Sequence, residues 1–137
     1  MATDFLSVMS ADNIRFARSK TLYEKADGTY NLINIPKFAF VTAVWLIITQ
    51  AYAGGAGDTC TVGFTGNGET ADPDGFIDDT FAAATSTGVK CSNGDAQPAS
   101  SGKWFNTAGG QLTITLAKGT QTTLMIGHVV MAYTTLH

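Results

Sequence analysis

Acidic side chains that could bind a cation cluster in one short stretch of the sequence: Glu69, Asp72, Asp74, Asp78 and Asp79. The segment Asp72-Pro73-Asp74-Gly75 resembles the opening of a calcium loop, in which alternate acidic residues converge on the ion. It lacks the third alternating ligand and the closing bidentate glutamate of an EF-hand. A turn that starts a helix from Asp74 to Ala84 explains the same residues, because acidic side chains cap and stabilise helix N-termini. Calcium binding therefore stays open as an alternative to a capped helix.

The cysteine and histidine residues do not form a zinc-binding pattern. A structural zinc site usually needs four Cys or His ligands, and Cys60 and Cys91 are accompanied only by His128 and His137, which lie far along the chain. Cys60 alternates with apolar residues on one face of an expected strand, which favours a buried thiol. A Cys60–Cys91 disulfide remains an alternative if the protein matures under oxidising conditions. We expect no metal and no cofactor.

Catalytic patterns are missing from the sequence. There is no Gly-x-Ser-x-Gly elbow, phosphate loop, dinucleotide fingerprint or zinc-protease helix. His128 lies within an apolar stretch, where a lone histidine is more often a packed or interface residue than a general base. Four aromatic residues could form a carbohydrate-binding platform: Trp45, Tyr52, Trp104 and Phe105. Their spacings favour positions in the hydrophobic core instead. We therefore expect no enzymatic activity.

The most apolar segment runs from Phe38 to Ile48 and must be explained by any fold. It is too short for a spanning helix, which needs about 20 apolar residues. It also lies too far from the first residue for an ordinary export signal, although Ala51-Tyr52-Ala53 resembles a cleavage site. Because its residues are mostly β-branched or aromatic, the segment predicts a strand buried on both faces. We expect no membrane span.

Charge is sparse and unevenly distributed. The chain has 137 residues, of which 14% are charged, and its net charge is −3. This argues against nucleic-acid binding, which needs a clustered basic face, and so low a charge density suggests that a partner covers part of the surface. Basic residues outnumber acidic ones up to Lys37, whereas acidic residues dominate afterwards. Either two functional regions or an ordinary solvated surface explains this small imbalance.

The first 36 residues predict an arm followed by a hairpin. Ser10 to Asn13 could cap a short helix through Ile14 and Phe16, and Asp27-Gly28 is a strong turn signal between two possible strands. We expect an N-terminal arm and hairpin over residues 1–36 and a β-sandwich domain over residues 37–137. The arm supplies the candidate partner-binding residues: Phe5, Leu6, Ile14, Arg15, Phe16 and Arg18.

Alternating patterns predict about seven or eight strands and a mainly β fold. Gln111 to Leu116 alternates strictly between threonine and aliphatic residues, whereas Thr122 to Thr135 is apolar on both faces and should lie inside a sheet or be covered by a partner. The expected architecture is a two-sheet antiparallel β-sandwich of jelly-roll type with an extended N-terminal arm. An immunoglobulin-like Greek key is the alternative. In that fold the tryptophan lies between the two cysteines, whereas here Trp104 follows both of them.

The run from Tyr30 to Leu46 resembles the start of small jelly-roll virion proteins of tailed bacteriophages, in which an Ile-Pro step leads into a Val-Thr-x-Val-Trp strand. Residues that continue the resemblance cover the last hundred positions of the chain: Thr61–Gly63, Ala71–Phe76, Gly110–Leu116 and Thr122–Tyr133. No motif matches the N-terminal arm. The resemblance implies a capsid-decorating, cement or tail-associated role without catalytic residues.

On this resemblance, we expect a cement protein that bridges capsid subunits and stabilises the head. The implied partners are the major capsid protein and further copies of the chain, with a homotrimer favoured. The implied location is the capsid surface of the virion, after synthesis in the host cytoplasm. A tail-associated or receptor- or glycan-binding β-sandwich module is the alternative function, and a secreted adhesin with bridged cysteines is a further one.

Overall fold

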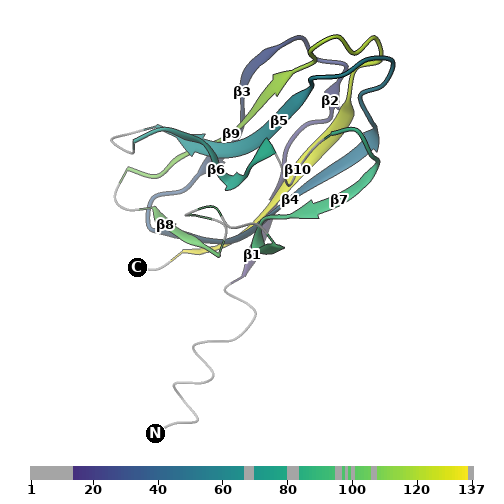
Figure 1. Ribbon diagram of the computed structural model, residues 1–137. Coiled ribbons are helices and arrows are strands. Elements are labelled where there is room, and N and C mark those ends of the chain that lie inside the picture. Colours follow the sequence, from purple (N-terminus) through teal and green to yellow (C-terminus); the bar gives the residue numbers. More distant parts are fainter. Residues whose placement is uncertain are drawn as a thin grey trace, which may run out of the picture.

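Two antiparallel β-sheets pack face to face and make up most of the protein (Figure 1). The computed structural model describes residues 14–66, 70–79, 84–94, 97, 99, 101–105 and 108–135. The predicted fold class, a mainly β two-sheet sandwich, is confirmed. Among the described residues, no helix is long and apolar enough to cross a membrane.

The first sheet, called sheet A, has β10 and β4 at its centre. One edge is formed by β1 and β2, which both pair with β10, and the other by β7 and β8, which both pair with β4. Its strands are β1 (Arg15–Arg18), β2 (Leu22–Tyr23), β4 (Ala39–Gln50), β7 (Gly88–Cys91), β8 (Lys103–Phe105) and β10 (Ile126–Thr135).

The second sheet, called sheet B, has the order β3-β9-β5-β6. Its strands are β3 (Gly28–Ile35), β5 (Thr59–Thr65), β6 (Asp72–Ile77) and β9 (Gly110–Ala117), and a short 3-10 helix at Ser92–Gly94 follows β7. Consecutive strands often lie in different sheets. The chain passes from β2 in sheet A to β3 in sheet B and back to β4 in sheet A, and later from β9 in sheet B to β10 in sheet A. Among the described strands, β5 and β6 alone form a hairpin within one sheet. This alternation is the jelly-roll topology expected from the sequence.

The core lies between the sheets and follows the period of two that strands impose on side chains. In sheet B, Leu112, Ile114 and Leu116 of β9 are buried, as are Cys60 and Val62 of the neighbouring β5. Each large apolar side chain buried in this way contributes about 1.5–3 kcal/mol to folding. Strands β5 and β6 approach so closely that a Cβ atom at Gly63 would collide with the carbonyl oxygen of Asp72.

The two most apolar segments occupy the two central positions of sheet A, as predicted for the segment from Thr122 to Thr135. Strand β4 lies between β10 and the β7/β8 edge, and β10 lies between β4 and the β1/β2 edge. Val41, Leu46 and Val129 face the core and have no solvent exposure. Side chains on the other face of β4, such as Trp45 and Ile47, are only half-buried. The prediction that the segment from Phe38 to Ile48 is buried on both faces is therefore wrong: one face is buried and the other is partly open.

Two local predictions for the N-terminal part are wrong. Residues Arg15–Arg18 form the edge strand β1 and pair with β10, so no helix passes through Phe16. The predicted hairpin around Asp27-Gly28 does not form, because β2 pairs with β10 whereas β3 pairs with β9. That turn instead carries the chain from sheet A to sheet B. Residues 15–35 thus contribute strands to both sheets, on the N-terminal side of the boundary predicted at residue 36.

The predicted helix from Asp74 to Ala84 is wrong over its first part. Residues Asp72–Ile77 form strand β6, in which Phe76 and Ile77 are fully buried. Pairing with β5 and burial against the core outweigh the helical spacing of these apolar residues. Residues 80–83 lie outside the described residues.

Candidate functional site

Sheet A exposes a broad apolar surface on the side that faces away from the core. Opposed residues of an antiparallel pair point to the same face. Trp45 of β4 is opposite Val130 of β10 and Cys91 of β7, and Ile47 is opposite His128 and Val89 in the same way. We call this surface the outer face of sheet A and define it by six apolar residues: Phe16, Trp45, Ile47, Val89, Trp104 and Val130.

Several of these side chains are open to solvent although they are large and apolar. Phe16 is 67% exposed, Val89 is 61% exposed and Trp104 is 41% exposed, whereas Trp45 and Val130 are half-buried. They come from β1, β4, β7, β8 and β10, so the patch crosses the whole width of the sheet. Contiguous exposed apolar patches of this kind usually mark an interaction site.

Aromatic contacts organise the patch at two places. The Phe16 and Trp45 ring centroids lie 6.3 Å apart, and those of Phe38 and Trp104 lie 6.4 Å apart. Both distances are in the range of favourable aromatic pairs. Phe38 adopts a left-handed backbone conformation with φ of 59°, which is unusual for a bulky residue. The turn before β4 thereby places an aromatic ring beside β8.

A cationic group borders the patch on its β1 side. Arg18 is exposed, lies opposite Val130, and donates a hydrogen bond to the hydroxyl of Thr21 at 3.5 Å. His128 lies on the same face, and burial, with a smaller contribution from Arg18, lowers the pKa of its imidazole. The imidazole is therefore mostly neutral at pH 7. The surface offers apolar contact area beside a guanidinium group, which suits protein binding.

The predicted partner-binding residues are placed as follows. Phe5 and Leu6 lie outside the described residues. Ile14, at 45% exposure, precedes β1, and the side chains of Arg15, Phe16 and Arg18 are exposed along β1 at the edge of sheet A. The structure thus brings Phe16 and Arg18 to the outer face of sheet A.

Sequence reasoning missed Val89 and assigned Trp45 and Trp104 to the core. The signal that could have found them was the apolar character of both faces of β4, because only one face of a sandwich sheet packs on the core. The sequence does not show which residues of β4 lie on the open face, because a bulge between Ala132 and Tyr133 of β10 shifts the pairing register along β4.

Four members of the acidic cluster lie among the described residues and are engaged mostly within the fold, whereas Glu69 lies outside the described residues. Asp79 accepts a hydrogen bond from the backbone N–H of Cys60 at 3.1 Å, and Asp78 accepts one from the Gln97 amide at 2.8 Å. Asp72 lies beside Asp74, and burial and this neighbouring carboxyl group raise the pKa of Asp72. Within the part of the chain that the structure describes, no three metal-ligating side chains come together. The calcium alternative gains no geometric support.

The two cysteines are free thiols in different sheets. Cys60 is buried in β5, whereas Cys91 is partly exposed in β7, so the alternative of a Cys60–Cys91 disulfide is not realised. Burial, with smaller contributions from Asp79 and Asp58, raises the pKa of the Cys60 thiol to about 12. Cys60 is therefore protonated and unreactive at neutral pH, as expected for a packed thiol.

The topology defines a jelly-roll β-sandwich, and the outer face of sheet A is its open apolar surface. No protein-family profile matches the chain, and no curated protein matches it. Solved structures do share its fold. A chain of the capsid of Ralstonia phage GP4 superposes with a TM-score of 0.68 at 16% sequence identity, covering 90% of this chain and 85% of its own length.

Two further capsid structures contain similar chains. In the acidic stable capsid of Helicobacter pylori bacteriophage KHP30, the TM-score is 0.61 at 18% identity, with 88% of this chain and 86% of that chain covered. In the capsid of cyanophage Pam1, the TM-score is 0.62 at 14% identity, with 90% and 86% covered. The resemblance predicted from the sequence is therefore confirmed at the level of the fold.

Proposed function

We propose that this chain is a non-enzymatic structural protein of a phage virion that decorates the capsid surface and cements neighbouring capsid subunits. The observation that carries the proposal is the fold likeness to chains of three phage capsids, which extends over 88–90% of this chain. The major capsid protein is the expected partner.

The outer face of sheet A provides a surface suited to this role. Cementing requires a contact area that stays exposed in the free protein and becomes buried on the shell. Phe16, Val89 and Trp104 meet the first condition. Aromatic residues in such a position commonly carry much of the binding free energy of an interface. We assign this face, together with Arg15 and Arg18 of β1, to contact with the capsid subunits.

The proposal also gives a role to the N-terminal arm. Residues 1–13 precede β1 and include the apolar residues Phe5 and Leu6. An apolar segment tethered beside a docking face can bind a second groove or sheet edge, and the two contacts reinforce each other through effective concentration. In this proposal one copy bridges two capsid subunits through the arm and the outer face of sheet A.

The proposal is tested by adding purified full-length protein to capsids that were assembled without it. We expect saturable co-sedimentation with the capsids and a higher temperature of capsid disruption. Electron microscopy of the decorated particles should place the density on the head surface. Protein that neither sediments with the capsids nor changes their disruption temperature, or density found on the tail, would refute the cement role.

A further inference from the structure

Strand β1 lies at an open edge of sheet A, among the described strands, and it borders the outer face of that sheet. The backbone N–H of Ser19, directly after β1, donates a hydrogen bond to the carbonyl of Val129 in β10 at 2.9 Å. Backbone groups alternate sides along a strand, so those of Ala17 also point toward β10. The N–H and C=O groups of Phe16 and Arg18 therefore point away from β10, toward the open edge.

The opposite strand has the matching pattern. Ala132 of β10 lies opposite Phe16, and its carbonyl accepts a hydrogen bond from the hydroxyl of Thr42 in β4 at 3.2 Å, so it faces β4 and not β1. The four residues of β1 pair with β10 without a register shift and include no proline. Bulges and prolines are the usual means of preventing further pairing at a sheet edge. The β1 edge is thus regular and can accept another strand.

The side chains along this edge are basic. Arg15, Arg18 and Lys20 are exposed, and residues 14–23 contain no acidic side chain. Among the described residues none of the three cations forms an ion pair, and the guanidinium group of Arg18 donates only the hydrogen bond to Thr21 at 3.5 Å. The edge therefore offers positive charge to a partner.

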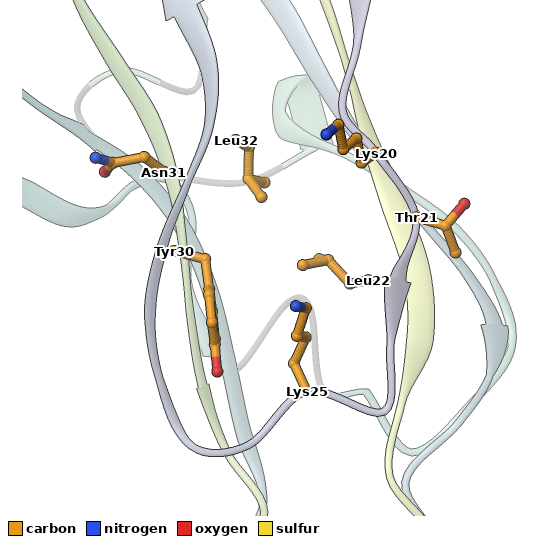
Figure 2. Close-up of a pocket in the computed structure, with 7 residues that line it drawn as sticks. All are labelled: Lys20, Thr21, Leu22, Lys25, Tyr30, Asn31 and Leu32. Atoms are coloured by element: carbon orange, nitrogen blue, oxygen red, sulfur yellow. The ribbon is translucent and has the colours of Figure 1, made fainter.

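The charge is mixed at the adjoining cleft, which has a volume of about 380 Å³ and lies between β2 and β3 (Figure 2). Lys20 and Lys25 lie at its two ends, but the loop that carries Lys25 also carries Glu24 and Asp27. The uniformly basic part of the edge is therefore β1 together with Lys20.

These charges decide between two kinds of added strand. If β1 of a second copy paired antiparallel with all four residues of β1, Arg15 would lie opposite Arg18 at both ends of the pair. Like charges directly opposite each other destabilise a sheet. A segment with carboxylates opposite Arg15 and Arg18 is stabilised instead, and apolar residues between the carboxylates would lie opposite Phe16 and Ala17.

We propose that β1 binds an extended segment of a capsid subunit by strand addition, and that this segment reads acidic, apolar, apolar, acidic along its sequence. The added strand runs antiparallel, as in the pairs of described strands in both sheets. Its first carboxylate lies opposite Arg18 and its second opposite Arg15, because opposed residues of an antiparallel pair share a face. Phe16 belongs both to this edge and to the outer face of sheet A, so the two contacts are continuous. The inference rests on the proposed function and specifies how the capsid subunit is bound.

A synthetic peptide tests the edge in solution, without capsids. The probe is the capped peptide Thr-Thr-Asp-Val-Val-Glu-Thr-Thr, and the control peptide has lysine at both acidic positions. Titration into the full-length protein, followed by NMR, should shift the backbone amide signals of Phe16 and Arg18 saturably with the acidic peptide only. Arg18→Gln removes one exposed charge pair and should weaken binding by about two- to fivefold. Lys118→Gln removes the same charge at an exposed position after β9 and should bind normally.

Three outcomes of the titration would overturn the inference. One is that the acidic peptide does not bind, or shifts signals away from β1. Another is that the lysine peptide binds equally well, or that Arg18→Gln has no effect. The third is that the peptide binds only after residues 1–13 are removed, which would assign the edge to the chain's own Asp4 and Asp12 segment.

Hydrogen exchange on decorated capsids tests the same contact in the complex. The outward amides of Phe16 and Arg18 should exchange much more slowly on the capsid than in the free protein, because strand addition places them in hydrogen bonds. Protein that sediments with capsids while these amides still exchange freely would overturn strand addition and leave the cement role standing. Peptide binding at β1 without any binding to capsids would refute the cement role instead.

Discussion

The aromatic rings of Phe16 and Trp45 lie 6.3 Å apart between centroids, on the outer face of sheet A. Phe16 belongs to the edge strand β1 and Trp45 to the central strand β4, so this contact reaches across β10, which separates the two strands. The contact fixes the first described strand on the surface that we assign to capsid binding. An aromatic pair of this geometry is worth about 0.5–1.5 kcal/mol beyond the area that it buries.

A charge on the outer face of sheet A should weaken capsid binding without unfolding the protein. We expect Val89→Asp, at a side chain that is 61% exposed, to change the free energy of unfolding by no more than about 0.5 kcal/mol. Binding should weaken by at least about tenfold, because a carboxylate would be buried in an apolar contact. Co-sedimentation with capsids and urea unfolding measure the two effects.

The matched control for that variant is Thr29→Asp, at an exposed position of β3 in sheet B, where Thr29 shares a hydrogen bond with Thr115 at 2.9 Å. It introduces the same charge on the opposite side of the sandwich. Normal capsid binding by Val89→Asp, or equal loss of binding by both variants, would argue against the assignment of the outer face.

Two truncations separate the arm from the edge strand. Removal of residues 1–13 should leave the unfolding temperature nearly unchanged, because every described strand remains. Removal of residues 1–18 also deletes β1, all four residues of which pair with β10. We therefore expect this truncation to lower the unfolding temperature by several degrees. Scanning calorimetry measures both. If the arm contributes to binding as proposed, the shorter truncation should already weaken co-sedimentation; full binding by it would refute that contribution.

A buried serine holds the start of the 3-10 helix after β7 against β4. The hydroxyl of Ser92 accepts a hydrogen bond from the backbone N–H of Val44 at 2.9 Å, and both residues are fully buried. Ser92→Ala leaves this N–H without a partner, so we expect a loss of about 1–3 kcal/mol in urea unfolding. Ser86→Ala, at an exposed position near Lys90, is the control and should have little effect. Equal effects of the two changes would contradict this role for Ser92.

Stability should fall in alkaline solution. Burial is the main cause that raises the pKa of Cys60 from 9.0 to about 12 and that of Tyr52 from 10.0 to about 12. Between these values the folded state binds more protons than the unfolded state, so the free energy of unfolding decreases as pH rises. Below pH 9 both groups are protonated in both states, and their full contribution to stability is present.

Urea unfolding at several pH values between 8 and 11 measures this slope, and Tyr52→Phe tests its origin. The phenol oxygen of Tyr52 is buried and, among the described residues, has no hydrogen-bond partner. The substitution should therefore leave stability at pH 8 equal or higher, while it flattens the decrease above pH 9. An unchanged alkaline slope in this variant would show that Tyr52 does not titrate as described.

The sequence predicts correctly those strands in which residue composition and the alternation of apolar residues both indicate β structure. Leu112, Ile114 and Leu116 alternate with polar or small side chains, and the structure buries them as expected in β9. The segment from Phe38 to Ile48 was recognised as a strand from its β-branched and aromatic residues, and it forms most of β4. Such segments are predictable because local preference and tertiary burial favour the same conformation.

The misses have two physical causes. Segments as short as β1 and β6 have too few residues to show a strand or helix periodicity, so distant parts of the chain decide their structure. In β1, Phe16 lies opposite Ala132 of β10. In β6, Phe76 packs in the core. A turn signal such as Asp27-Gly28 marks a reversal without stating which sheet the next strand joins. The candidate surface was missed for the same reason, since only the packing of the two sheets decides which face of β4 stays open.

The order of pairing in sheet A also constrains when the protein can fold. Strand β10 separates β2 from β4 and pairs with both, yet it is synthesised after every other strand of the sandwich. While the chain leaves the ribosome, β4 therefore exposes one edge and an apolar face until residues 126–135 emerge. Contacts between such distant segments form slowly, and exposed strand edges aggregate readily. Sheet A is thus completed only when β10 pairs with β4, and this pairing sets the moment at which the outer face becomes available to a partner.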